Sequence, residues 1–202
     1  REGVVVKRDF EKALKWYRRS AEQGLADAQC NLGLMYEEGQ GVKQNYEEAV
    51  KWYRLASEQG YILAEANLGL MYEEGKGVMQ NSEKAVKWYR LSAEQGFSGA
   101  QSKLGLMYEN GKGVMQDYKE AVRLYRQSAN QGNVLGQKYL GVMYVLGQGV
   151  SKNYEEAHMW FNLCGSQAYK QCLREKNILE KLMTPSQIEK AQDMARNWKP
   201  KK

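Results

Sequence analysis

One motif recurs along this chain every 36 residues, and each recurrence stays in register with the last. Its centre is a Leu-Gly pair followed by a tyrosine, first seen at Leu32, Gly33 and Tyr36. The same pair stands at Leu68-Gly69, Leu104-Gly105 and Leu140-Gly141. A fixed period of this length is typical of repeat proteins, whose units bury a continuous core by stacking on their neighbours. The chain is therefore predicted to be an array of stacked units.

Each unit is predicted to form two helices. Residues 25–38 place Ala28, Leu32 and Met35 on one apolar stripe at helical spacing. Residues 46–59 form the second helix, and an Asn or Asp precedes it as the N-cap. The cap positions are Asp9, Asn45, Asn81, Asp117 and Asn153, with Glu48, Glu120 and Glu156 three residues later in a capping-box arrangement.

Two glycine positions in each unit have different expected roles. Gly39 and its equivalents follow the first helix, where a left-handed residue commonly closes a helix. Gly33 lies inside that helix, where glycine costs roughly 1 kcal/mol relative to alanine. We expect Gly33 to allow the close approach of a bulky neighbour.

The repeated residues resemble the Sel-one-like repeat (SLR) family, relatives of tetratricopeptide repeats with a consensus similar to A-x-A-Q-x-x-L-G-x-M-Y-x-x-G-x-G-V. The similarity covers Asp9 to about Gly165. It implies an all-α fold, a right-handed α/α superhelix of stacked helix pairs, used as a non-catalytic and often bacterial adaptor. Residues 1–165 would form the array, with units starting near residues 25, 61, 97 and 133 after a half unit, and residues 166–202 a divergent last helix and a C-terminal cap.

Both ends of the chain depart from the complete unit. Glu2 and Gly3 align with Glu38 and Gly39, so the chain is expected to begin at the end of a first helix whose body is missing. A signal peptide could have been removed together with that helix. Near the other end, residues 168–182 are expected to be helical. Thr184-Pro185-Ser186-Gln187 predicts the start of a further helix with a capping box. Its apolar face is expected to cover the open end of the stack; the residues are Ile188, Ala191, Ala195 and Trp198.

The sequence contains few residues suited to catalysis. The single histidine, His158, has no cysteine or acidic cluster at metal-ligand spacing and is expected to be an ordinary helix-surface residue. The Gly-x-Gly pairs follow helices and lack the Lys-Ser/Thr of a phosphate loop. Carboxylates recur in every unit, which favours an architectural role over an acid and base pair. We therefore predict a protein that is not an enzyme and has no cofactor and no metal.

Cys164 and Cys172 occupy register positions that hold small residues in the other units. The resemblance adds that cysteine-rich relatives bridge their helix pairs with a C-x7-C spacing, and seven residues also separate these two cysteines. Two interpretations stay open: a disulfide, which would require an oxidising compartment such as the periplasm, or two small buried thiols. Cys30 is expected to be reduced. A periplasmic or secreted location is favoured over the cytoplasm.

The resemblance also implies where a partner would bind, because the first helix of each tetratricopeptide-like pair lines a concave groove. Three positions of each first helix are expected to face that groove. They are Asn31, Leu34 and Glu37; Asn67, Leu70 and Glu73; Lys103, Leu106 and Glu109; and Tyr139, Val142 and Val145. A protein or peptide with basic and aliphatic side chains would fit an acidic and aliphatic groove of this kind.

Three of these positions are glutamates, which we call the acidic row: Glu37, Glu73 and Glu109. They stand near helix C-termini, where negative charge opposes the helix dipole. Either they pair with Lys or Arg of a neighbouring helix, or they are available to bind a basic partner. The net charge of +6 also raises the possibility of nucleic acid. The basic positions of the second helices have acids four residues away, which favours a solvated face. Only around Arg123 and Arg126 do Lys119 and Asn130 replace those acids, forming a patch that could bind an acidic partner.

The sequence thus predicts a protein-binding scaffold that is a monomer and does not bind nucleic acid or span a membrane. Its partner would be a protein or peptide, for instance a toxic effector neutralised by an immunity protein, or a cell-envelope enzyme. The alternative is a peptidoglycan- or glycan-binding envelope protein. A glycan groove would need aromatic residues, and Tyr139 is nearly alone there.

Overall fold

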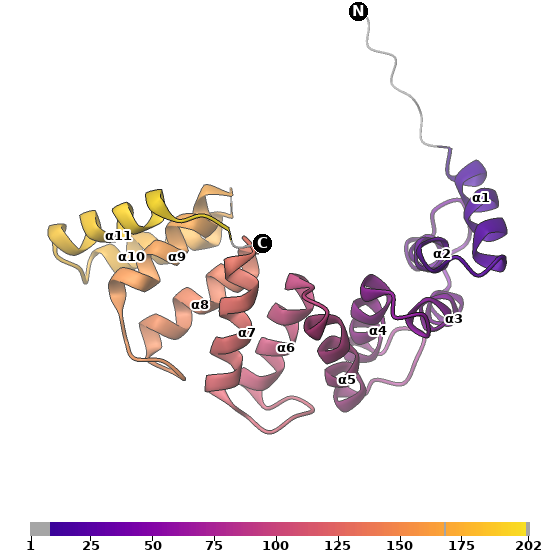
Figure 1. The fold of residues 1–202 in the computed structure, drawn as a ribbon, viewed down its shortest axis with the longest axis horizontal. Coiled ribbons are helices and arrows are strands. Elements are labelled where there is room, and N and C mark those ends of the chain that lie inside the picture. Colours follow the sequence, from indigo (N-terminus) through magenta and orange to yellow (C-terminus); the bar gives the residue numbers. More distant parts are fainter. Residues whose placement is uncertain (1–8, 168, 201–202) are drawn as a thin grey trace, which may run out of the picture. The chain divides into compact units, whose positions relative to one another are not determined.

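The computed structural model describes residues 9–167 and 169–200, in which every regular element is an α-helix (Figure 1). In chain order the helices are α1 (Phe10–Glu22), α2 (Ala26–Glu38), α3 (Tyr46–Ser57), α4 (Ile62–Glu74), α5 (Ser82–Glu94), α6 (Ser98–Asn110), α7 (Tyr118–Asn130), α8 (Val134–Leu146), α9 (Tyr154–Ser166), α10 (Lys170–Glu180) and α11 (Pro185–Asn197). The two helices predicted over residues 25–38 and 46–59 are α2 and α3. The predicted all-α repeat of helix pairs is confirmed.

The chain divides into two compact units, which we describe separately. Unit 1 ends at Trp88 and unit 2 begins at Tyr89, a boundary that lies within α5. In unit 1, α2 packs against both α1 and α3, and α3 packs against α4. In unit 2, α7 packs against α6 and α8, and α9 packs against α8. From α1 to α4 and from α6 to α9, helices that follow one another in the chain are therefore neighbours in space, as stacked helix pairs require.

The glycine inside the first helix allows an aromatic ring of the second helix to approach closely. A Cβ atom added to Gly33 would lie 2.6 Å from the Tyr53 ring, and one added to Gly105 would lie 2.6 Å from the Tyr125 ring. Tyr53 and Tyr125 are completely buried. The expected close approach is confirmed, and it explains why glycine is used despite its cost in a helix.

The predicted caps are confirmed at both kinds of helix end. The Asn45 side chain accepts a hydrogen bond from the backbone N–H of Glu48, and Asp9, Asn81, Asp117 and Asn153 cap their helices in the same way. Gly39 closes α2 in the left-handed conformation, with φ of 71°. The capping-box arrangement predicted for Glu48, Glu120 and Glu156 was wrong, because the backbone N–H groups of the three N-cap residues donate to tyrosine carbonyls of the preceding helix instead. The carboxylates of Glu48 and Glu120 bind the side chains of Lys51 and Arg123.

The second glycine of the Gly-x-Gly pair sets how closely a loop approaches the preceding helix pair. Gly149 has φ of +68°, and a Cβ there would collide with the backbone carbonyl of Tyr118 at the start of α7. Gly41 stands in the same relation to Phe10 in unit 1, where the added Cβ would lie 2.5 Å from the carbonyl oxygen. The loops after α2, α4 and α8 therefore lie directly against the starts of α1, α3 and α7.

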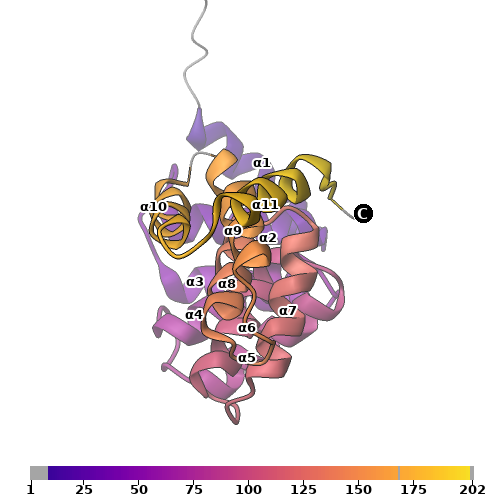
Figure 2. The same cartoon turned by 90° about the vertical axis from the view of Figure 1, so that its left-hand side faces the viewer.

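The C-terminal helices both lie against α9 (Figures 1 and 2). Helix α10 covers Lys170–Glu180, within the helix predicted over 168–182, although Ala168 lies outside the described residues. The predicted capping box of α11 is present between Thr184 and Gln187. Ala191 is buried, and the Trp198 ring meets the edge of Trp160 with centroids 6.1 Å apart. Helix α11 thus buries its apolar face against the array, as expected of a cap.

The prediction for His158 was wrong, because this residue is completely buried in α9. Its Nε2 atom lies 2.8 Å from a carboxylate oxygen of Glu180, at the end of α10. This hydrogen bond, more than any other contact, holds the pKa of Glu180 below its usual value. The repeat pattern could not reveal this burial, because α10 departs from that pattern.

Glu2 and Gly3, on which the expected start of the chain depends, lie outside the described residues. Within the described ranges, no helix combines the length and the apolar character required to cross a membrane.

Candidate functional site

The groove residues predicted in unit 1 come from α2 and α4, and all of them are partly exposed. They are Asn31, Leu34 and Glu37 on α2, and Asn67, Leu70 and Glu73 on α4. Asn31 and Leu34 line a cavity of about 400 Å³, together with Phe10 and Tyr17 of α1. Helices α1 and α2 therefore form a hollow that contains two of the predicted residues.

In unit 2 the corresponding residues come from α6 and α8, which contact each other. Lys103, Leu106 and Glu109 lie on α6, and Tyr139, Val142 and Val145 lie on α8; all six are partly exposed. The Tyr139 ring stacks on Tyr125 at a centroid distance of 5.1 Å.

Val142 and Val145 of α8 pack against buried residues of α9 and α10. This core cluster contains Phe161, Cys172 and Leu179. These two predicted groove residues therefore contact α9 and α10 on one side and are only partly exposed.

The acidic row is engaged by buried tyrosines, an arrangement that neither of the two sequence interpretations included. The Tyr53 hydroxyl donates a hydrogen bond of 2.5 Å to the Glu37 carboxylate, and the Tyr125 hydroxyl donates one of 2.5 Å to Glu109. Burial, and then these hydrogen bonds to an anion, raise the pKa of both tyrosines far above its usual value. The glutamates thus satisfy hydroxyl groups that would otherwise be buried without an acceptor.

A signal for these pairs is present in the sequence. In the last unit the tyrosine is replaced by Phe161 and the glutamate by Val145, so the hydroxyl and its acceptor disappear together. Because a carboxylate has two oxygens and about four acceptor sites, one tyrosine hydroxyl leaves room for a cation or N–H group from a partner.

The arginines of the second helices link consecutive helix pairs. In each case a guanidinium nitrogen donates to a tyrosine hydroxyl 18 residues later. The pairs are Arg18 with Tyr36 (2.8 Å), Arg54 with Tyr72 (2.9 Å), Arg90 with Tyr108 (2.9 Å) and Arg126 with Tyr144 (3.1 Å). The sequence spacing predicted that these arginines pair with acids of their own helix. In the structure they instead bind tyrosines of the following helix.

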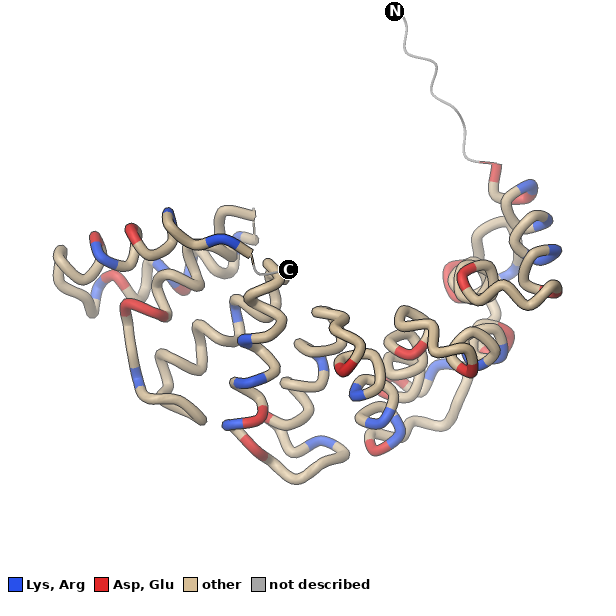
Figure 3. The backbone as a smooth tube through the Cα atoms, viewed as in Figure 1, with Lys and Arg blue, Asp and Glu red and all other residues tan. Residues whose placement is uncertain are grey.

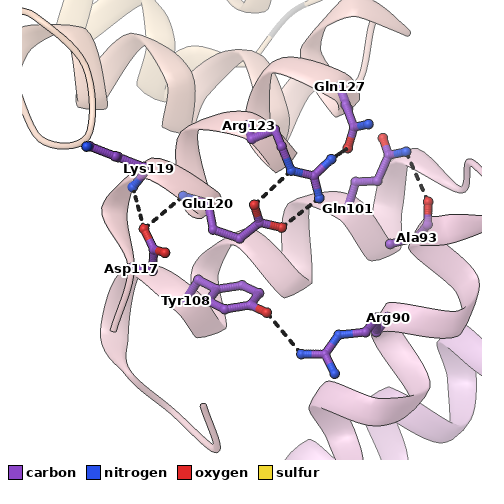
Figure 4. A network of polar contacts seen from close by, with 9 residues as sticks. All are labelled: Arg90, Ala93, Gln101, Tyr108, Asp117, Lys119, Glu120, Arg123 and Gln127. Carbon is purple, nitrogen blue, oxygen red and sulfur yellow. Dashed lines mark hydrogen bonds and ion pairs between the residues drawn. The ribbon is translucent and has the colours of Figure 1, made fainter. Parts of the chain in front are cut away.

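Helix α7 carries several basic positions, and its one acidic residue, Glu120, lies in its first turn (Figure 3). Figure 4 shows that the Arg123 guanidinium binds both oxygens of Glu120, at 2.6 and 2.8 Å, and donates to Gln127 at 3.1 Å. The side chain of Arg123 is therefore fixed along its own helix. Arg90 reaches Tyr108 on the neighbouring α6.

Cys164 of α9 and Cys172 of α10 form a disulfide, with their Cα atoms 5.9 Å apart. Cys30 is a free thiol, 2% exposed, and burial raises its pKa to about 12. No group of three His, Cys, Asp or Glu side chains in the described part of the chain is arranged to hold a metal ion.

We expect iodoacetamide to label one cysteine in the unfolded, unreduced protein and all three after reduction. In the folded protein Cys30 should react slowly, because a pKa raised from 9.0 to about 12 leaves about a thousandfold less thiolate below pH 9. Its labelling rate should then rise about tenfold per pH unit until the fold is lost. Mass spectrometry of the labelled protein measures both. Three labels before reduction would show that the disulfide is absent.

The repeat geometry is matched by one family along most of the chain. The Sel1 repeat profile matches residues 1–25, 26–61, 62–97, 98–133 and 134–165. The chain belongs to the Sel1 repeat family. Sel1 repeats mediate protein interactions, and proteins built from them are generally non-catalytic scaffolds.

Solved structures of other Sel1 repeat proteins resemble this one closely. The protective antigen c5321, present in uropathogenic Escherichia coli strains, is 37% identical with a TM-score of 0.83; the match covers 96% of this chain but 42% of that protein. A Sel1 repeat protein from Oxalobacter formigenes is 35% identical with a TM-score of 0.82, covering 100% of this chain and 81% of the other.

A more distant structure shares the fold alone. Immunity protein Pa5087 from Pseudomonas aeruginosa is 18% identical with a TM-score of 0.60, covering 95% of this chain and 75% of that protein. No curated protein sequence matches the chain.

Proposed function

We propose that this Sel1 repeat protein is a non-catalytic scaffold that binds a partner protein with the exposed face of its first helices. The observation that carries this proposal is the surface formed by the predicted groove residues. Asn31 and Leu34 line a cavity of about 400 Å³ in unit 1, and a partly exposed glutamate lies on the same helix. Protein-binding sites combine apolar anchor points with a polar surround in this way.

The partner that fits best has basic and aliphatic side chains. Glu37 and Glu109 each bind a tyrosine hydroxyl and retain acceptor sites for Lys or Arg. Leu34 and Leu106 stand one helical turn before these acids and are also partly exposed. A short basic and apolar segment could therefore contact both kinds of side chain in either unit.

We further propose that the protein works in an oxidising compartment, the periplasm or the cell exterior, where a disulfide such as Cys164–Cys172 persists. A partner of the effector class would make this chain an immunity protein. Its likeness to Pa5087 concerns the fold, so the partner class has to come from the experiment itself.

Partner capture tests the proposal directly. Glu37→Gln, Glu73→Gln and Glu109→Gln together remove the charge of the acidic row and keep an oxygen that can accept from tyrosine. We expect capture of the partner from a lysate of the source organism to fall at least about tenfold, since charged contacts at a buried interface commonly contribute that much or more.

A matched control removes three exposed glutamates of the second helices: Glu11→Gln, Glu47→Gln and Glu83→Gln. Both variants change the net charge equally, so a loss confined to the first set identifies the first-helix face. Equal capture by both variants and the native chain would refute the proposed face.

A further inference from the structure

Unit 2 contains a cavity of about 380 Å³ between the last turns of α5 and the helices α6 and α7. Its floor is apolar and consists of Ala93, Leu104 and Leu124. Its rim is polar and carries both signs of charge, from Arg90 and Arg123 and from Glu94 and Glu120. We call this cavity the Leu124 slot. Several residues around it are drawn in Figure 4.

The repeat explains why the slot exists. Leu124 takes the register position that holds Trp52 and Trp88 in the two preceding repeats. In unit 1 Trp52 packs against a core cluster that contains Ala21 and Leu32, the register equivalents of Ala93 and Leu104. The space that an indole ring occupies in unit 1 is therefore held by a much smaller side chain in unit 2.

The surroundings of the two positions are otherwise alike. The Gln29 side chain donates to the Ala21 carbonyl at 3.2 Å, and the equivalent Gln101 donates to Ala93 at 3.3 Å. The same two glutamines accept bonds of 2.8 and 2.9 Å from Gln59 and Gln131. The frame around the slot thus repeats that of unit 1, and it has not closed to compensate for the smaller leucine.

The slot is also accessible. Trp52 remains partly exposed in unit 1, so the corresponding space in unit 2 opens to solvent. Arg123 lies at the edge of the slot, where Glu120 and Gln127 hold its guanidinium along α7. The floor residues Leu104 and Leu124 are 3% and 2% exposed, so a bound ring would cover the small apolar area that they leave open.

We propose that the Leu124 slot binds an aromatic side chain, of the size of tryptophan, that projects from a partner protein. The aromatic preference follows from a frame that holds an indole elsewhere in the same chain. The slot itself favours neither sign of charge, because Arg90 and Arg123 line it together with Glu94 and Glu120. Buried aromatic residues commonly supply the largest part of interface energy.

This site is separate from the first-helix face of the proposed function, since its rim belongs to the second helices α5 and α7. If the slot does not bind an aromatic side chain, the proposed function of the first-helix face is unaffected. If partner capture by that face fails, the slot proposal is likewise unaffected.

The experiment is a titration of the full chain with acetyl-Glu-Trp-Glu-amide, followed by the methyl NMR signals of Leu104 and Leu124. We expect saturable shifts, and nuclear Overhauser contacts from the indole protons to these two methyl groups. Acetyl-Glu-Ala-Glu-amide should give no saturable shifts, because it lacks the ring that fills the slot. Equal binding of the two peptides would overturn the aromatic preference.

The variant Leu124→Trp restores the residue of the other repeats and should fill the slot. We expect the peptide affinity to fall at least about tenfold while thermal stability rises, as cavity filling usually gives. Unchanged peptide affinity in this variant would overturn the proposal. So would the absence of Overhauser contacts to Leu104 and Leu124 in the native chain, a measurement that depends on no variant.

Discussion

Replacing Gly149 with alanine should lower the free energy of unfolding by about 2–5 kcal/mol. Its φ of +68° costs an L-residue about 1–2 kcal/mol. In addition, the new Cβ would collide with the backbone at Tyr118, and forced overpacking of this kind typically costs about 1–3 kcal/mol. Urea denaturation followed by helical circular dichroism measures the change as a lower midpoint.

Gly132→Ala is the matched control for this experiment. Gly132 has a similar φ of +83°, but no atom lies within 4 Å of the position that its Cβ would take. This variant should therefore lose only the 1–2 kcal/mol or so of backbone strain. Equal losses in the two variants would show that the loop can move away from α7.

Replacing Glu109 with valine should cost about 1–3 kcal/mol, because the hydroxyl of the fully buried Tyr125 loses its acceptor. The double variant Glu109→Val, Tyr125→Phe reproduces the pair Val145 and Phe161 of the last unit. We expect it to recover most of the loss, since removing both partners leaves no unsatisfied polar group. The free energies of unfolding of the two single variants and the double variant complete a cycle.

Two results would be informative beyond the cycle itself. Glu109→Gln keeps an acceptor oxygen, so it should lose less stability than Glu109→Val. Losses that simply add in the double variant would mean that the hydrogen bond between Tyr125 and Glu109 contributes nothing to stability.

Much of the fold follows from the repeat alone. Helix positions, N-caps such as Asn45, the left-handed Gly39 and the close approach at Gly33 were all predicted, because each depends on neighbours within one unit or the next. His158 was mispredicted because its environment is made by α10, which breaks the pattern. Sequence periodicity shows on which face of a helix a residue lies. It does not show which other part of the chain packs against that face.

The candidate sites were less predictable, for a different reason. Helical spacing places a tyrosine such as Tyr53 on an apolar stripe, but it does not show where the hydroxyl finds an acceptor. The sequence likewise shows that Leu124 stands where other repeats have tryptophan, yet whether the space stays open depends on how far neighbouring helices relax. The twelve predicted groove residues share a partly exposed environment, and their contact with a partner remains a prediction.

The Arg–Tyr contacts bear on how such a chain can change its length. Each joins residues 18 positions apart, half of the 36-residue period, so the contact is defined entirely within adjacent modules. Deleting or duplicating a whole module would bring an equivalent arginine to an equivalent tyrosine. A deletion of a few residues would leave both unmatched. Viable variants of this protein should therefore differ in length by whole modules.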